Sequence, residues 1–179
     1  MEVMRLTPAH ESLFASWLQE HRGIVVKVTR AYAPNATDAA DLEQELLLQL
    51  WKSLPSYTGQ AKASTWIYRV CLNTALKWRR STTRREERIE PGHETAEFAA
   101  PAPSPAESAG DREVLERLYA AIQAMPAFDR ALVLLMLDGL AYREIAEITG
   151  LTENHVGVAL TRARKRLAEL MKGVTHELE

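Results

Sequence analysis

Cysteine is nearly absent from this chain of 179 residues: Cys71 stands alone, so no internal disulfide can form. A lone cysteine also excludes a metal site built from several thiolates, and we expect Cys71 to be a small buried side chain. The five histidines show no spacing typical of metal ligands or of a catalytic base, and no glycine-rich loop of the phosphate-cradling kind occurs. The sequence therefore predicts no metal, no cofactor and no enzymatic activity.

Long apolar runs are also missing. No stretch approaches the length needed to cross a bilayer, and the N-terminus lacks a cationic region followed by an apolar segment. We therefore expect a soluble, cytoplasmic protein without membrane insertion. The 46% of apolar residues is enough to build helical cores, in one domain or in two small ones.

Strand-like alternation is absent, whereas helical periodicity is extensive. Residues 11–80 and 113–171 look helical, with breaks near Pro34, at Pro55–Ser64, at Met125-Pro126, at Asp138-Gly139 and at Gly150. The segment between them is rich in proline, alanine and acid. The sequence predicts an all-α fold: two small helical domains, 1–82 and 113–179, joined by a flexible linker, 83–112. A linker of that length spans roughly 30 Å when relaxed, so the two units could stand well apart on one partner.

The net charge of −2 conceals a segregation of charge. Basic residues outnumber acids in 1–82, whereas acids outnumber basic residues in 83–112. Residues 62–85 and 154–168 contain no acid at all. Two cationic surfaces of this kind suit nucleic acid despite the acidic total.

Residues 142–167 read as a helix, a tight turn and a second helix with a cationic end. Ala146 is small enough for two helices to approach closely, and Gly150 falls where the first must end in a left-handed conformation. Thr152 can cap the second helix, and Val156 packs back against the first. An amphipathic helix with a solvated basic end is the alternative, but charge alone does not explain these small and branched positions. We predict a DNA-binding helix-turn-helix.

The second helix of this motif has a buried and an outward side. Helical spacing buries Val156, Leu160, Ala163, Leu167 and Met171. The outward side, its cap and its flanks provide the candidate DNA contacts, which are Thr152, Asn154, His155, Val158, Thr161, Arg162, Arg164 and Lys165, with Arg166 also on a flank.

A third informative segment covers residues 38–54. Its leucines and Trp51 form a buried stripe, whereas Asp38, Asp41, Glu45 and Leu48 align on another face. Acids beside an exposed apolar residue suit a basic protein partner. A solvated face with acids near the helix N-terminus is the simpler alternative for this segment alone.

The helix after the Pro55–Ser64 loop has its own polar face. One side of the helix carries Trp66, Arg69, Asn73, Lys77 and Arg80. The opposite side, which faces inward, carries Ile67, Val70, Cys71, Thr74 and Trp78. Stacking, base-edge and phosphate-binding groups on one face suit a single-stranded nucleic acid. A helix with extended basic side chains and Trp66 in the core is an equal alternative.

These motifs occur in an order and spacing that resemble the extracytoplasmic-function sigma factors of bacterial RNA polymerase. The resemblance rests on DAADLEQELLLQLW, STWIYRVCLNTALKWRR, a proline-rich linker, and AMPAFDRALVLLMLDGLAYREIAEITGLTENHVGVALTRARKRL. It covers about residues 10–82 and 113–171, nearly everything outside the linker and the termini.

The resemblance implies partners and a division of labour. Core RNA polymerase would dock on Asp38, Asp41, Gln44, Glu45 and Leu48. The minus-ten element would be melted, and its flipped bases captured, by Gly59, Gln60, Lys62, Ser64, Trp66, Arg69, Asn73, Lys77 and Arg80. The helix-turn-helix would read the minus-thirty-five duplex, with the linker threaded through the polymerase. An anti-sigma factor is a further candidate partner.

Two departures and one rival function accompany this resemblance. Members often carry basic or hydroxyl residues where this chain has Gly157, Val158 and Ala159, so shape and phosphate contacts should weigh more in duplex binding. Members of the family often carry an acid at the position of Lys77, so the lysine of this chain should strengthen phosphate binding. The rival is a helix-turn-helix transcription regulator that is not a sigma factor, which would need an N-terminal ligand or phosphoryl-acceptor domain; the sequence offers no βα framework for one.

Overall fold

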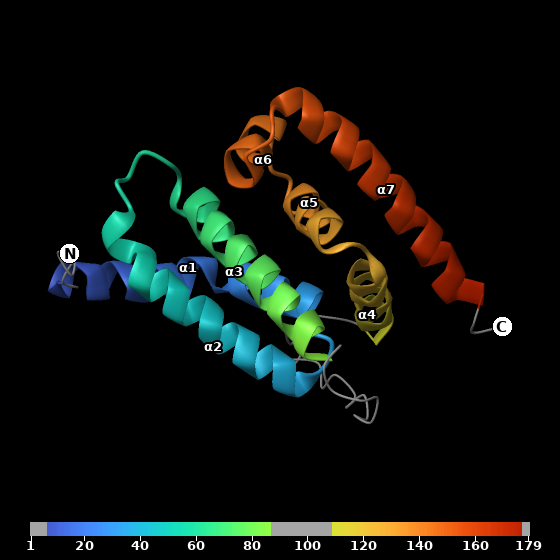
Figure 1. Ribbon diagram of the computed structural model, residues 1–179, viewed down its shortest axis with the longest axis horizontal. Helices are drawn as coiled ribbons and strands as arrows, with labels where there is room; N and C mark the ends of the chain where they lie inside the picture. Colours follow the sequence, from blue (N-terminus) through green and yellow to red (C-terminus); the bar gives the residue numbers. More distant parts are fainter. Residues whose placement is uncertain (1–6, 87–108, 177–179) are drawn as a thin grey trace.

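The computed structural model describes residues 7–86 and 109–176, and all regular structure within them is helical (Figure 1). The N-terminal unit contains α1 (Pro8–Tyr32), α2 (Ala36–Ser53), a short 3-10 helix η1 (Leu54–Ser56) and α3 (Ala63–Glu86). The C-terminal unit contains α4 (Ala109–Ala124), α5 (Ala127–Leu137), α6 (Tyr142–Thr149) and α7 (Glu153–His176). The all-α prediction is confirmed. Most of the predicted linker, residues 87–108, lies outside the described residues.

Local signals explain where the helices of the N-terminal unit begin and end. The chain leaves α1 just before Pro34, and the Asn35 side chain caps α2 by accepting a hydrogen bond from the Asp38 amide at 2.9 Å.

α1, α2 and α3 pack pairwise around a core that contains Val28, Leu42 and Cys71, all with no exposed surface. Burial raises the pKa of the Cys71 thiol to about 12.

In the C-terminal unit, α7 runs along α4, α5 and α6 (Figure 1). α5 is the most buried element, because residues 130–135 all lie inside. The breaks fall where the sequence predicted them: Pro126 precedes α5, and Gly139 and Gly150 have φ values of 72° and 76°. Both glycines therefore adopt the left-handed conformation that side chains with a Cβ rarely tolerate.

The two units are packed against each other, although a linker of the predicted length would also allow them to stand apart on a partner. α1 contacts α4 and α5, and α3 contacts α5 and α6. Gln123 of α4 donates from Nε2 to the carbonyls of Arg30 at 2.7 Å and Ala33 at 3.1 Å, and the Tyr32 hydroxyl donates to the Ala127 carbonyl at 2.6 Å. The last carbonyls of α1 have no partner within their own helix, so the second unit supplies donors for them.

Candidate nucleic-acid and protein-binding surfaces

A groove of about 600 Å³ separates the outer faces of α2 and α3. Four of the five residues predicted to dock a basic partner line it: Asp41, Gln44, Glu45 and Leu48. The Leu48 side chain is 41% exposed. The opposite wall comes from α3 and contains Thr74, Lys77, Trp78 and Ser81. The acids beside an exposed apolar residue therefore exist as one concave surface.

Asp38, the fifth predicted docking residue, is placed differently. Its amide binds the Asn35 side chain, and its carboxylate accepts from Asn35 Nδ2 at 2.8 Å. This geometry matches the alternative of an acid near a helix N-terminus. Glu45 is also held, because its Oε1 accepts from Gln49 Nε2 at 2.8 Å within α2.

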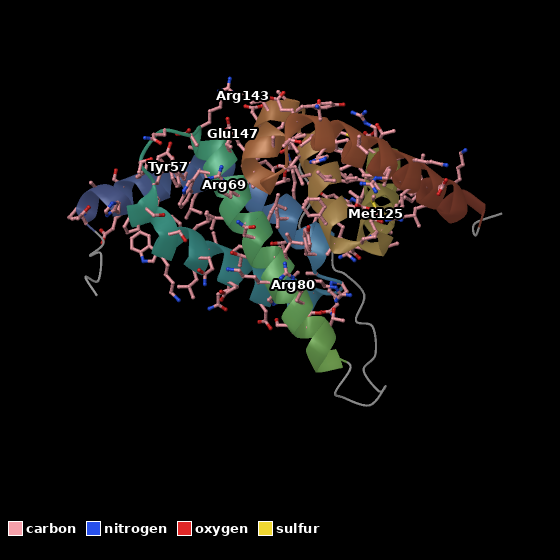
Figure 2. The ribbon with its side chains drawn as sticks, turned by 45° about the horizontal axis from the view of Figure 1, so that its top comes forward. Tyr57, Arg69, Arg80, Met125, Arg143 and Glu147 are labelled. Carbon is pink, nitrogen blue, oxygen red and sulfur yellow. The ribbon has the colours of Figure 1, made fainter. Side chains whose placement is uncertain are left out.

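The polar side of α3 divides between two directions. Arg69, Asn73, Lys77 and Arg80 are all exposed, as the helical spacing predicted. Lys77 turns toward the α2 groove, whereas Arg69 lies beside α6, and Figure 2 shows Arg80 further along α3. Asn73 and Arg80 are therefore the exposed side chains of this face that line neither the groove nor the α6 contact.

Trp66 belongs to an aromatic cluster. Its ring centroid lies 5.4 Å from that of Trp17 and 5.5 Å from that of Tyr57. It is half-buried against the core, which agrees with the alternative that the sequence left open. Trp66 thus anchors the loop before α3 to α1, with only part of its ring accessible.

The loop before α3 is exposed and locally fixed. Gly59 has a φ of 77°, and the Tyr57 hydroxyl donates to the Ala61 carbonyl at 2.9 Å. Gln60 and Lys62 are exposed, and Ser64 is half-buried at the start of α3. A loop held in this way presents polar groups at one end of the helix.

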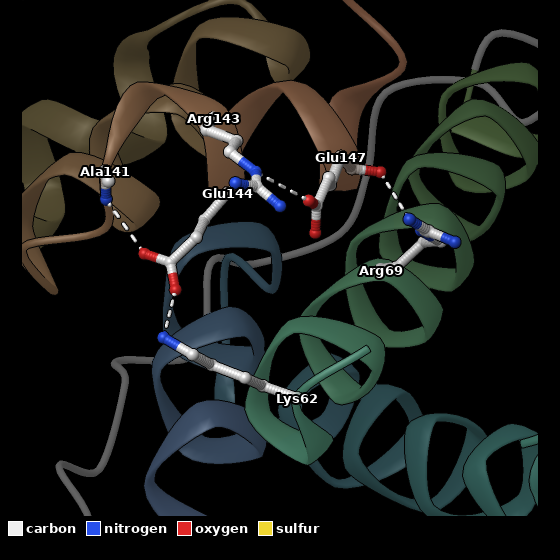
Figure 3. A network of polar contacts seen from close by, with 6 residues as sticks. All are labelled: Lys62, Arg69, Ala141, Arg143, Glu144 and Glu147. Carbon is white, nitrogen blue, oxygen red and sulfur yellow. Dashed lines mark hydrogen bonds and ion pairs between the residues drawn. The ribbon is translucent and has the colours of Figure 1, made fainter. Parts of the chain in front are cut away.

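α6 meets the loop and the first turns of α3 through a polar network (Figure 3). Lys62 Nζ lies 2.7 Å from Glu144 Oε1, and the other Glu144 oxygen accepts from the Ala141 amide at 3.0 Å. Arg69 donates to the Glu147 carbonyl at 2.6 Å. The hydrogen bond from Lys62 lowers the pKa of Glu144, and the same bond raises the pKa of Lys62. No sequence pattern indicated these contacts.

The helix-turn-helix has the geometry that the sequence predicted. The Gly150 amide donates to the Ala146 carbonyl at 2.9 Å, and Thr152 Oγ1 accepts from the His155 amide at 3.3 Å. Val156, Leu160 and Ala163 are fully buried, whereas Leu167 and Met171, which the spacing also placed inside, are half-buried. The outward side is exposed and comprises Asn154, His155, Val158, Thr161, Arg162 and Lys165.

Two cations on the flanks of α7 contact α5. Arg166 pairs with Asp129 of α5 at 2.6 Å, and Arg164 donates from Nε to the Met136 sulfur at 2.9 Å. Both are exposed, but both are oriented by α5. Arg162 and Lys165 are thus the cations on the outward side itself.

The centre of the outward side is apolar. Val158 is 58% exposed, and the Thr161 hydroxyl donates back to the Gly157 carbonyl at 2.9 Å. A Cβ built on Gly157 would lie 3.5 Å from Cε2 of Tyr142, whose ring is 42% exposed. Sequence reasoning missed Tyr142, because its proximity to Gly157 depends on how α6 crosses α7.

Within the described residues, no group of three or more His, Cys, Asp or Glu side chains could hold a metal ion. Among the same residues, no helix combines the length and the apolar character that a bilayer crossing requires.

Comparisons with known proteins match both units. Residues 17–85 match the family model of sigma-70 region 2, and residues 115–167 match that of sigma-70 region 4. The ECF RNA polymerase sigma-E factor of Escherichia coli (strain K12) is 26% identical over 176 residues, covering 92% of this chain and 90% of that protein.

Two solved structures share the fold. The sigma factor RpoE of Bartonella quintana, in complex with the anti-sigma factor NepR, matches with a TM-score of 0.69 at 20% identity, over 93% of this chain and 98% of that one. CnrH in complex with the cytosolic domain of CnrY matches with a TM-score of 0.63 at 19% identity, over 91% and 90%.

Proposed function

Because this chain belongs to the sigma-70 family, as a sigma factor of the extracytoplasmic-function group, we propose that three of its surfaces divide the work of promoter opening. A sigma factor binds core RNA polymerase and directs it to initiate at specific promoters. We assign polymerase docking and the minus-ten element to residues 1–82, the connection to 83–112, and the minus-thirty-five element to 113–179. The regulator alternative is not favoured, since regions 2 and 4 both match, in that order.

The α2–α3 groove is the proposed polymerase-docking surface. Asp41 and Glu45 supply negative charge, Gln44 supplies hydrogen bonds, and Leu48 supplies an exposed apolar contact. A basic helical surface on the polymerase would complement this combination. Asp38 contributes through the α2 cap, so we keep it as a residue that positions the start of the helix.

The loop and outer face of α3 are the proposed minus-ten surface. Gly59, Gln60, Lys62 and Ser64 come from the loop, and Arg69, Asn73 and Arg80 come from the helix. Cations and an amide in one row can neutralise phosphates and bind a base edge. Trp66 would offer only the accessible part of its ring, and Lys77 lies where this surface meets the docking groove.

α7 is the proposed minus-thirty-five reader. Arg162 and Lys165 are placed for phosphates, and Asn154 for a base edge. Val158 is an apolar group at the centre of the face, where it can contact a thymine methyl. Thr152 and His155 at the start of the helix, Thr161 within the face and Arg164 on its flank complete the candidate set.

Further partners follow from the family and from a solved complex. The sigma factor RpoE of Bartonella quintana, which shares this fold, is bound by the anti-sigma factor NepR, and we infer that a partner of that kind regulates this chain. Binding to RNA polymerase would place its action in the cytoplasm. We propose no enzymatic activity and no cofactor for it.

One observation supports the division of labour: an acid-lined groove and an adjoining cationic face occur on the same unit, with the reading helix on the other. The test is transcription by core polymerase with this chain on a pool of genomic promoter fragments. We expect initiation at a defined subset without any other sigma factor. If the chain were a conventional regulator, it could not replace the housekeeping sigma factor, and no transcript would appear.

A further inference from the structure

Two of the cations assigned to the melted strand are occupied by α6. Lys62 is paired with the Glu144 carboxylate, and Arg69 binds the carbonyl of Glu147 (Figure 3). Glu147 lies in the last turn of α6, where carbonyls without a helical partner carry the negative end of the helix dipole. A carboxylate and a carbonyl oxygen therefore stand where the phosphate oxygens of a strand would bind.

α6 is held in this position by contacts elsewhere on the same interface. Asp138, just after α5, binds Lys27 of α1 at 2.5 Å and accepts from the Tyr68 hydroxyl of α3. Gln123 binds the end of α1 further along the interface. An exposed ion pair such as Lys62 with Glu144 contributes little by itself. The packing of the two units keeps Lys62 and Glu144 opposite each other.

The same arrangement leaves the duplex-reading face open. Asn154, Val158 and Arg162 are exposed while α6 lies against α3. The described chain therefore presents its minus-thirty-five surface and partly covers its minus-ten surface.

We propose that α6, through the Glu144 carboxylate and the Glu147 carbonyl, competes in cis with the phosphates of the melted strand for Lys62 and Arg69. The proposal rests on the minus-ten assignment above. The chain then binds duplex through α7 without rearrangement, whereas a single strand must first displace α6. Strand binding and separation of the two units are thermodynamically linked. If the strand shifts the equilibrium toward separated units by some factor, separating the units raises strand affinity by the same factor.

The test compares strand and duplex affinities of full-length variants. Glu144→Gln removes the charge that holds Lys62 but keeps an acceptor for the Ala141 amide, as glutamine does in a capping box. The probes are a mixed-sequence single strand of about 12 nucleotides and a mixed-sequence duplex, each followed by fluorescence anisotropy. We expect about twofold to fivefold tighter strand binding and unchanged duplex binding.

Glu116→Gln is the matched control, because it removes the same charge from an exposed position on α4. Equal gains from both substitutions, or no gain from Glu144→Gln, would refute competition by α6. In a Lys62→Ala background, the Glu144→Gln gain should disappear. If Lys62→Ala left strand affinity unchanged in the Glu144→Gln background, where the ion pair with α6 no longer opposes the strand, the minus-ten assignment would itself be wrong, and this proposal would fall with it.

Discussion

Arg130 of α5 donates from Nη1 to the Ala31 carbonyl of α1 at 3.2 Å, which joins the two units through a buried side chain. Its Nε donates to the Met125 carbonyl at 2.8 Å, and its Nη2 donates to the Gln123 carbonyl. Burial lowers the pKa of this guanidinium. Three carbonyls near the α4–α5 turn and the end of α1 thus depend on one residue.

Replacing Arg130 by methionine should therefore destabilise the protein. The volume is similar, but three acceptors are left without their donor, so we expect the free energy of unfolding to fall by about 2–4 kcal/mol. Urea denaturation followed by circular dichroism measures this. Arg143→Met makes the same charge change at a side chain that is 80% exposed and should cost less than about 0.5 kcal/mol. Equal costs would mean that the hydrogen bonds of Arg130 add nothing to stability.

Polymerase docking should depend on the acids of the groove. Asp41→Arg combined with Glu45→Arg places two positive charges opposite a basic partner, so association with core polymerase should be abolished while helicity is kept. Co-purification with core polymerase is the measurement. Glu43→Arg reverses a charge on the same helix, outside the groove lining, and should leave association intact. Retained binding by the double variant would exclude the groove as the docking site.

Asn73 and Trp66 should behave differently when replaced by alanine. Asn73 is exposed, so Asn73→Ala should change stability by less than about 0.5 kcal/mol but slow open-complex formation on a promoter. Trp66→Ala removes the contacts with Trp17 and Tyr57 and should cost about 2–3 kcal/mol of stability. Stopped-flow promoter melting and urea denaturation separate the two effects. Wild-type melting by Asn73→Ala would move the minus-ten face elsewhere.

Cys71 offers a probe of unfolding. Cys71 has no exposed surface, and burial raises its pKa from 9.0 to about 12, so the folded thiol stays inaccessible and protonated at pH 8. A thiol reagent should label it only as fast as the protein unfolds, and fully in denaturant. The raised pKa contributes stability that is present below pH 9.0 and is lost as pH rises toward 12. Rapid labelling of the folded chain would contradict this burial.

The sequence predicted features that depend on local chemistry. Gly150 needs a left-handed conformation whatever surrounds it, and Asn35 caps α2 through a bond to a residue three positions away. The outward side of α7 follows from helical periodicity, and Val158 and Arg162 are exposed as expected. Such signals require no knowledge of the rest of the fold.

Contacts between the units could not be predicted in this way. Lys62 and Glu144 are 82 positions apart, and no periodicity links them. Arg69 binds a backbone carbonyl, which every residue provides, so its partner leaves no sequence signature. Periodicity also places Trp66 on the same side as Arg69, but a large ring can lean along the helix surface toward Tyr57. Helical spacing predicts the direction in which a side chain leaves the helix axis. It does not predict how far the side chain extends along the surface.

Cations on α7 should separate into those that bind DNA and those that bind α5. Arg162→Ala and Lys165→Ala should weaken binding to selected and unrelated duplexes alike and lower the slope of log affinity against log salt by about one unit for each phosphate that is no longer neutralised. Arg166→Ala is the comparison, because Arg166 is paired with Asp129 and its replacement should leave that slope unchanged. Salt titration of the full chain is the measurement. If Arg162→Ala abolished discrimination at one base pair without changing the slope, Arg162 would read sequence.

Val158 should read thymine through its methyl group. It is the exposed apolar centre of the α7 face, and the Thr161 hydroxyl beside it already donates to Gly157. Replacing a contacted thymine by uracil removes only the methyl, so wild-type affinity for a duplex selected from a random pool should fall about fourfold at that position. Val158→Ala should bind the thymine and uracil duplexes almost equally, because the partner of the methyl is gone. Asn154→Ala should keep the full thymine preference while losing discrimination at another base pair. If Val158→Ala retained the wild-type preference for thymine, the methyl would be read by another group, and the ring of Tyr142 beside Gly157 would be the next to test.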